Sequence, residues 1–249
     1  MKPLLLLVVL SVLVGVAARA AEVDHAHHYR ACMILVQRDP DAAFDAAVNW
    51  GELGGGDAAR HCLAAALMGK GRHAEAAGRF QSLAEEIKAE PAMKADLLGH
   101  AGQAWLMAGR AGLAYGALTT ALELKPDDAD LLLDRSAALA ALGSYAEAVA
   151  DLDRVIEVEP GRADGWVFRA SAKRLIDDLD GAQADAERAL QLESLHPEGL
   201  LERGIIRRLG GDEAGARQDW MLVINSARGT AAADAARANI EKMDVRTDK

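Results

Sequence analysis

Residues 132–160 read LLDRSAALAALGSYAEAVADLDRVIEVEP, and this stretch decides the fold. Its apolar residues recur at helical spacing on both sides of Gly143, where a glycine interrupts the pattern as a turn would. Pro160 closes the stretch, and a proline cannot continue the interior of a helix. The stretch therefore predicts two helices joined by a short turn.

The same pattern recurs along the chain every 34 residues, as the spacing of Pro126 and Pro160 shows. Aligning on these prolines brings four sets of positions into register. The sets are Ala114, Ala148, Ala182 and Ala216; Gly102, Ser136, Ala170 and Gly204; Ala121, Val155, Ala189 and Val223; and the turn positions Gly109, Gly143, Asp177 and Gly211. One earlier unit lies 38 residues upstream, and its four extra residues, around Pro91, amount to one added helical turn. A single helix pair cannot bury its apolar stripe, so neighbouring pairs must stack.

This pattern resembles the tetratricopeptide repeat (TPR) family, whose 34-residue unit is a helix–turn–helix with small residues at the helix crossing and a proline near its end. The resemblance implies an all-α fold, a right-handed solenoid of about five units with a cap at each end. The units are 57–90, 95–128, 129–162, 163–196 and 197–230. Residues 21–56 are predicted to form an N-terminal capping helix pair, and residues 231–249 a C-terminal capping helix and tail.

Residues 1–20 have the pattern of a secretory signal peptide. Lys2 gives a positive start, residues 4–16 are apolar apart from one serine and one glycine, and Ala18-Arg19-Ala20 matches a cleavage site. The apolar run is too short to span a bilayer, which takes roughly 20 residues. We expect a secreted mature protein with no membrane insertion after cleavage. The alanine, arginine and glycine richness together with this signal favours the bacterial periplasm.

Composition excludes one class of function and favours helices. The chain has 28 basic and 38 acidic residues, and its net charge of −10 argues against nucleic-acid binding, which needs a basic face. Aromatic residues make up only 4% of the chain, and alanine is abundant, which favours helices over strands. The sequence has none of the H-E-x-x-H, G-x-S-x-G or Walker A motifs in the required context. We therefore predict no enzyme activity, no cofactor and no metal.

Cys32 and Cys62 are the only two cysteines of the chain. An even number in an oxidising compartment favours a disulfide, which would tie the N-terminal cap to the first unit. Closing this 30-residue loop would stabilise the fold by roughly 3 kcal/mol. Two buried thiols, or a zinc site with His28 and His61, are alternatives. The zinc site is disfavoured because neighbouring residues on a helix point about 100° apart. The sequence also leaves open whether the histidines at 25, 27 and 28 bind a metal.

A polar pattern follows the same period. Arginine recurs in the first helix and aspartate in the second helix of three units, as Arg135 with Asp151, Arg169 with Asp185, and Arg203 with Asp219. Unit 95–128 has Ala101 and Ala117 at the two equivalent positions, so both partners are missing together. This joint loss predicts structural Arg/Asp pairs, with ligand binding as the alternative.

The resemblance also implies a partner site, because in this family the first helix of each unit lines a concave groove. The groove residues carried over by position are Gln103, Leu106, Ser171, Arg174, Ile205 and Arg208. A mostly apolar lining suits an extended peptide or a partner helix. Arg174 and Arg208 are expected to lie side by side as a basic pair, unless nearby acids such as Asp164 and Glu198 neutralise them.

These features predict a non-catalytic scaffold or adaptor in the periplasm, which binds a peptide or partner helix of another protein in the concave groove. The alternative function is a binding module for a small molecule, a glycan or a metal. The sequence identifies neither the partner nor the oligomeric state.

Overall fold

The computed structural model describes residues 24–247, and in this part of the chain it contains thirteen helices and no strand. The predicted all-α class is therefore confirmed, whereas the predicted signal peptide lies outside the described residues. The helices are α1 (His25–Arg38), α2 (Pro40–Glu52), α3 (Gly56–Gly69), α4 (His73–Glu86), α5 (Pro91–Met107), α6 (Ala111–Leu124), α7 (Ala129–Ala141), α8 (Tyr145–Val158), α9 (Ala163–Leu175), α10 (Leu179–Leu192), α11 (Pro197–Leu209), α12 (Glu213–Ser226) and α13 (Ala231–Thr247).

The helices α3 to α12 form five consecutive pairs, one for each 34-residue unit read from the sequence. The first helix of the second pair, α5, begins at Pro91 and is 17 residues long, so the four extra residues form an added turn at its start. The helices α1 and α2 precede the five pairs, and α13 follows them. Each helix packs against the next one along the chain, which is the contact pattern of a solenoid.

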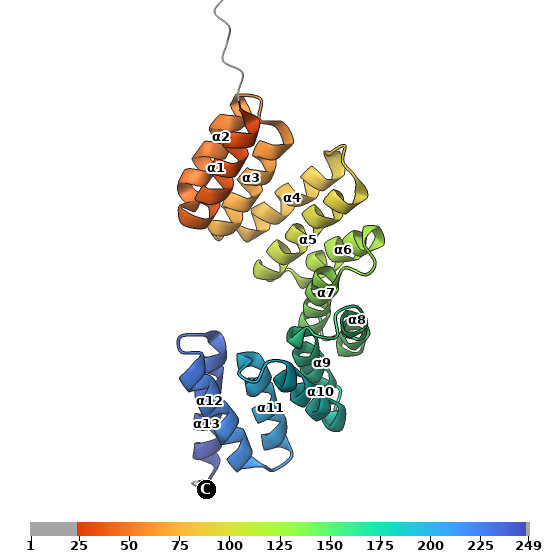
Figure 1. Cartoon of the computed structure of the whole chain (residues 1–249), viewed down its shortest axis with the longest axis vertical. Coiled ribbons are helices and arrows are strands. Elements are labelled where there is room, and N and C mark those ends of the chain that lie inside the picture. The colour runs from red at the N-terminus through yellow and green to blue at the C-terminus, as the bar shows by residue number, and fades with distance from the viewer. Residues whose placement is uncertain (1–23, 248–249) are drawn as a thin grey trace, which may run out of the picture.

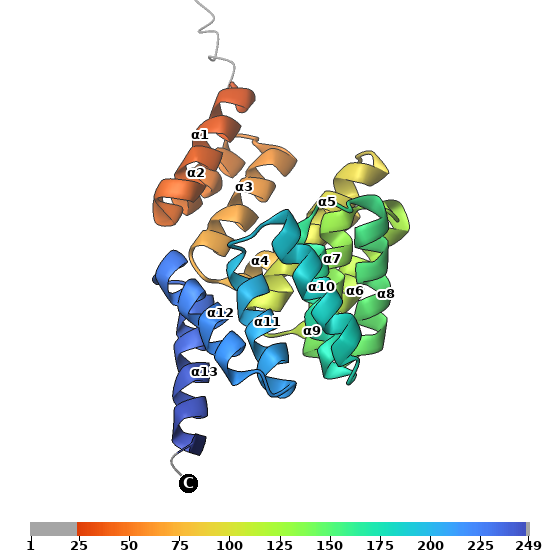
Figure 2. The same cartoon turned by 60° about the horizontal axis from the view of Figure 1, so that its bottom comes forward.

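The helix pairs follow one another along an arc (Figure 1). Its two ends, α1–α2 and α12–α13, lie on the same side of the molecule, and the middle pairs lie on the opposite side. In the turned view, α13 runs along α12 at the C-terminal end, and α1 and α2 lie beside α3 (Figure 2). The arc therefore has a concave side that faces the space between the two ends.

The turn inside each pair needs a residue in the left-handed conformation. Glycine occupies four of the five turns, and Asp177, with φ of 64°, occupies the turn of the fourth unit. Among the described residues, Asp177 is the only one other than glycine with a positive φ. A side chain in this conformation brings Cβ close to the following carbonyl oxygen, so the fourth unit carries a small strain that its neighbours avoid.

The two helices of a pair approach most closely where the first helix has a small residue. A Cβ atom on Gly102 would lie 2.4 Å from Cγ of Leu118, and one on Gly204 would lie 2.4 Å from Nε1 of Trp220. The larger side chain thus occupies the space that the glycine leaves open. This fit explains why the equivalent position in four successive units always holds a small residue. These residues are Gly102, Ser136, Ala170 and Gly204.

The core continues from one pair to the next as a series of apolar clusters. The largest cluster extends from α3 to α9 and consists mainly of alanine and leucine. A separate cluster around Cys32, Trp50 and Cys62 joins the N-terminal helices to α3, and another around Trp220 joins α10 to α13. None of the described helices is both long enough and apolar enough to cross a bilayer.

We predict that Asp177→Gly raises the free energy of unfolding by about 0.5–1 kcal/mol, because glycine adopts the left-handed conformation without the Cβ contact. Urea unfolding followed by circular dichroism measures the change. Gly143→Ala places a side chain in the equivalent turn and is the matched control, with an expected loss of about 1 kcal/mol. A less stable Asp177→Gly protein would contradict the interpretation.

Candidate functional site

The first helices of the units are not equally close to one another. The helix α1 contacts α3, α5 contacts α7, and α11 contacts both α9 and α13. Clefts open at the two other junctions, one between α3 and α5 and one between α7 and α9. These two clefts are the candidate binding sites.

The cleft between α7 and α9 has a volume of about 250 Å³. Its lining residues are Ser136, Ala137, Ala140, Ala148, Leu152, Phe168, Ser171, Ala172 and Leu175. Phe168 and Leu175 are large and apolar, yet 39% and 43% of their surfaces remain exposed. The alanines of α7 leave the opposite wall shallow, so the cleft can accept an apolar side chain from another molecule.

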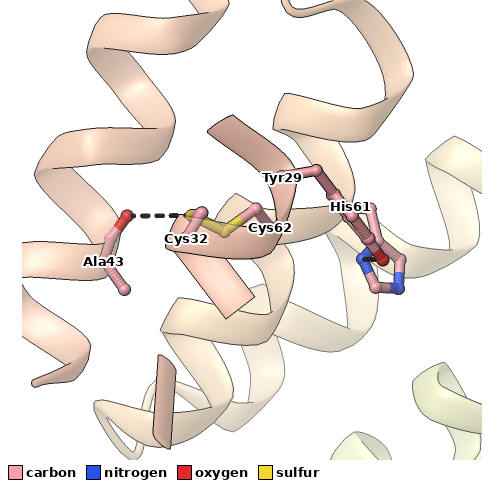
Figure 3. Close-up of a disulfide and its surroundings, with 5 residues drawn as sticks. All are labelled: Tyr29, Cys32, Ala43, His61 and Cys62. Carbon is pink, nitrogen blue, oxygen red and sulfur yellow. Dashed lines mark hydrogen bonds between the residues drawn. A yellow bond between two sulfur atoms is a disulfide. The ribbon is translucent and has the colours of Figure 1, made fainter. Parts of the chain in front are cut away.

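The cleft between α3 and α5 is larger, at about 570 Å³. Its lining residues are Tyr29, Asp57, Ala58, His61, Leu83, Ile87, Met93, Asp96, Leu97 and His100. The hydroxyl of Tyr29, on α1, lies 3.2 Å from Nδ1 of His61, on α3, and the two side chains point toward one another (Figure 3). The rings of His61 and His100 both pack against Phe80, at 5.7 Å and 5.2 Å between centroids.

The pKa values of two histidines in this cleft, His61 and His100, are lowered. Packed side chains replace water around His61 and lower its pKa below the ordinary histidine value, and the nearby His100 lowers it further. The same loss of water lowers the pKa of His100, against the attraction of Asp96. Both imidazoles are therefore uncharged at neutral pH.

The predicted groove residues fall into two groups. Ser171 lines the cleft between α7 and α9, and Gln103 is exposed and donates from Nε2 to Oδ2 of Asp134 in the next unit, at 2.8 Å. Burial raises the pKa of this aspartate. Leu106 and Ile205 are half-buried and pack against the core clusters, so their main contacts are internal.

Arg174 and Arg208 do not form the expected pair of free cations, because Arg174 is neutralised by an acid. Arg174 donates through Nε and Nη2 to the carboxylate of Glu202, which is buried on α11. The neutralising acid is therefore Glu202, whereas Asp164 and Glu198 instead contact His196. Of these two arginines, Arg208 is the one without an ion pair to the described part of the chain, and it is half-buried.

The three predicted Arg/Asp pairs are all brought together within their units. Each arginine donates through Nε and Nη2 to both carboxylate oxygens of its aspartate. The N–O distances are 2.8 and 2.6 Å for Arg135 and Asp151, 2.8 and 2.7 Å for Arg169 and Asp185, and 2.9 and 2.7 Å for Arg203 and Asp219. The aspartates are buried, so this two-point contact compensates a charge that has left water.

Two of the pairs have a second cation, which the sequence did not reveal. Lys173 lies 2.9 Å from Asp185, and Arg207 lies 2.8 Å from Asp219. Within the described residues Asp151 has Arg135 as its only cation, and these hydrogen bonds raise the pKa of Arg135. The pair in the third unit is thus the simplest of the three. Equivalent positions in the second unit are the buried Ala101 and Ala117.

Cys32 on α1 and Cys62 on α3 are joined by a disulfide, with 6.3 Å between their Cα atoms (Figure 3). The sulfur of Cys32 lies 3.6 Å from the carbonyl oxygen of Ala43, which places the bridge at the contact of α1, α2 and α3. The disulfide therefore fixes the N-terminal helices on the first unit, three residues from Tyr29 on α1.

The N-terminal histidines pack against one tryptophan. Nε1 of Trp50 donates to Nδ1 of His25 at 3.0 Å, and the ring of His28 stacks on Trp50 at 5.9 Å between centroids. The sequence had suggested weak metal binding as one alternative for these histidines. Among residues 24–247, no group of three His, Cys, Asp or Glu side chains is arranged to hold a metal ion.

Comparisons with known proteins identify the fold. No protein-family model matches the sequence, and no curated protein matches it either. Several solved structures do match. One is MamA (residues 41 to the end) from Desulfovibrio magneticus RS-1, which has 18% identity and a TM-score of 0.60 over 70% of this chain and 97% of that chain. TTC0263, a thermophilic TPR protein of Thermus thermophilus, has 19% identity and a TM-score of 0.60 over 74% and 98% of the two chains. This chain has the TPR fold.

A third solved TPR structure is YrrB, described as having an unusual peptide-binding site. It has 19% identity and a TM-score of 0.58 over 71% of this chain and 90% of that chain. At these identities the likeness concerns the fold, so the TPR solenoid read from the sequence is confirmed. The clefts and ion pairs described above belong to this chain's own residues.

We predict that Arg135→Ala lowers the free energy of unfolding by about 2–3 kcal/mol, because Asp151 would remain buried without a cation. Arg135→Ala with Asp151→Ala recreates the Ala/Ala arrangement of the second TPR unit and is expected to cost much less. Chemical denaturation of the two single variants and the double variant measures the coupling. Strictly additive effects would show that the two side chains do not interact.

Proposed function

We propose that this protein is a non-catalytic scaffold of the bacterial periplasm, which binds a peptide or helix of a partner protein on its concave TPR surface. The cleft between α7 and α9 carries the proposal. Phe168 and Leu175 expose apolar surface beside this cleft, although the chain has an extensive core in which to bury such side chains. Exposed apolar surface beside a shallow cleft is typical of a protein contact.

The helix that carries Phe168 is held firmly in place. Its neighbour Arg169 binds Asp185 on α10 and also donates to Oδ1 of Asp153 on α8, at 2.6 Å. One arginine thus connects three helices around the cleft. A cleft whose walls are fixed before binding loses little entropy on binding, which favours its use as a docking site.

The composition of this cleft favours binding over catalysis. Its lining residues are alanine, leucine, phenylalanine and serine. None of these side chains is a general acid or base near neutral pH, and a serine nucleophile needs such a base beside it. The peptide-binding site named for YrrB supports the same kind of role for a TPR surface.

The location rests on two observations. Residues 1–20 have the three parts of a secretory signal, and the two cysteines form a disulfide. Disulfides persist in the periplasm and are rare in the reducing cytosol. Both observations support export of the mature chain.

Phe168→Ser is expected to weaken the binding of the physiological partner by about tenfold, because it removes the largest apolar group at the cleft. The partner is first captured from periplasmic extract on the immobilised protein, identified, and purified, and its affinity is then measured by calorimetry. Leu113→Ser removes an apolar side chain on α6 that is still more exposed than Phe168, and is the control, with unchanged affinity. Equal loss in both variants, or none in either, would place the contact elsewhere.

Arg174→Glu with Arg208→Glu is a poor test of the groove. The first change would set a new carboxylate beside the buried Glu202, and the like charges would destabilise the contact between α9 and α11. A loss of binding would then reflect unfolding. Phe168→Ser avoids this problem because its side chain is already partly in solvent.

We further predict that protein recovered from the periplasm without reductant has no thiol that reacts with maleimide after denaturation, and that its first residue is Ala21. A variant that lacks residues 2–20 remains in the reducing cytosol and is expected to show two reactive thiols. Mass spectrometry measures both the thiols and the N-terminus. Two free thiols or an intact residue 1 in the natural protein would contradict export.

A further inference from the structure

The cleft between α3 and α5 is built from the two parts of the chain that depart from the regular repeat. The added helical turn at the start of α5 contributes Met93 to one wall. The N-terminal helix α1, fixed by the disulfide, contributes Tyr29 to another. The regular helices α3 and α4 supply the remaining wall. Both departures from the 34-residue unit therefore meet at one cavity of about 570 Å³.

This cavity is held in shape from several sides. Tyr29 contacts His61 through its hydroxyl, and its ring lies 6.4 Å from that of Trp50 in the cap. His61 and His100 in turn pack against each other and against the buried Phe80. A preformed cavity of this size with apolar walls and a few polar groups is what a ligand site requires.

The mouth of the cavity is negatively charged. Its two charged lining residues are Asp57 and Asp96, and each shares its cation with a second acid. Arg60 lies 3.2 Å from Asp57 and 2.9 Å from Glu86. Lys125 lies 2.7 Å from Asp96 and 3.1 Å from Asp128. Each cluster of two acids and one base keeps one net negative charge.

The interior does not offset this charge. His61 and His100 are uncharged at neutral pH, because loss of water around their rings lowers both pKa values. The remaining walls are apolar, with Leu83, Ile87 and Leu97 among them. An occupant must therefore supply an apolar group for the interior and positive charge for the mouth.

We propose that this cleft anchors a basic peptide segment of the partner, in which an aromatic or large aliphatic side chain fills the cavity and flanking Lys or Arg residues face Asp57 and Asp96. The proposal rests on the scaffold function above and defines the chemistry of the segment that is bound. It assigns a second contact point, separate from the α7–α9 cleft. The charge at the mouth disfavours an acidic peptide.

The test uses three synthetic peptides with blocked ends, in which the central residues are Lys-Phe-Lys, Glu-Phe-Glu and Lys-Gly-Lys. Titration into the full mature protein is followed by NMR of the imidazole protons of His61 and His100. Only the Lys-Phe-Lys peptide is expected to shift both signals in a saturable way. The acidic peptide and the peptide without an anchor are each expected to bind about tenfold more weakly or worse.

Asp57→Asn with Asp96→Asn is expected to weaken binding of the Lys-Phe-Lys peptide by about tenfold, because the attraction at the mouth is removed. The matched control is Asp127→Asn with Asp130→Asn. It removes the same charge from two exposed acids that also have cationic partners, Arg154 and Arg162, and its affinity is expected to stay unchanged. Circular dichroism melts verify that both double variants are folded. Equal affinity of the two double variants would overturn the proposal.

Three further outcomes would also overturn it. Equal binding of the acidic peptide would show that charge does not select the ligand. Equal binding of phenethylamine, a small amine with one ring, would show that the cavity takes a small molecule and needs no peptide. Partner capture that depends on Phe168 but survives Asp57→Asn with Asp96→Asn would refute this anchor site and leave the scaffold function intact. Peptide binding here without any capture through Phe168 would refute the scaffold groove alone.

Discussion

The close approach of the two helices within each unit is the contact on which the rest of this structure depends. A small residue in the first helix meets a larger side chain 16 positions later, as Gly102 meets Leu118 and Gly204 meets Trp220. In the third and fifth units the Arg/Asp pair lies at the same crossing, one residue earlier on each helix. Apolar fit and ion pairing therefore act at one point. The second unit achieves the same approach with Ala101 and Ala117, which shows that steric fit is the essential part.

The clefts follow from how these rigid pairs stack. The two helices within each pair pack closely. Differences between units therefore appear at the junctions between pairs, where some first helices contact one another and others leave space. The disulfide fixes α1 on the first unit, the added turn lengthens α5 of the second unit, and the larger cleft is lined by residues of both helices. The smaller cleft lies where the alanines of α7 face Phe168. Binding surface thus arises from irregularities in an otherwise periodic chain.

Some contacts at these sites could be read from the sequence, and others could not. The pairing of Arg135 with Asp151 was predictable, because a separation of 16 residues spans one helix pair and because both partners are lost together in the second unit. The contact of Arg174 with Glu202 was not, since these residues are 28 apart and belong to different units. Arg174 is therefore neutralised, as the alternative allowed, but by a different acid from the two that the sequence suggested. Likewise, nothing in the sequence indicated that His25 and His28 would pack against Trp50.

The sequence by itself determined the helices, their pairing, the turn residues and the ion pairs within units, because these features lie within a single helix pair. Helical periodicity fixes such spacings within narrow limits. Only the tertiary structure decided which neighbouring units touch, where the clefts open and which acid neutralises Arg174. These features depend on the angle between stacked units. That angle is the sum of many side-chain contacts along an interface, and no single residue or motif encodes it.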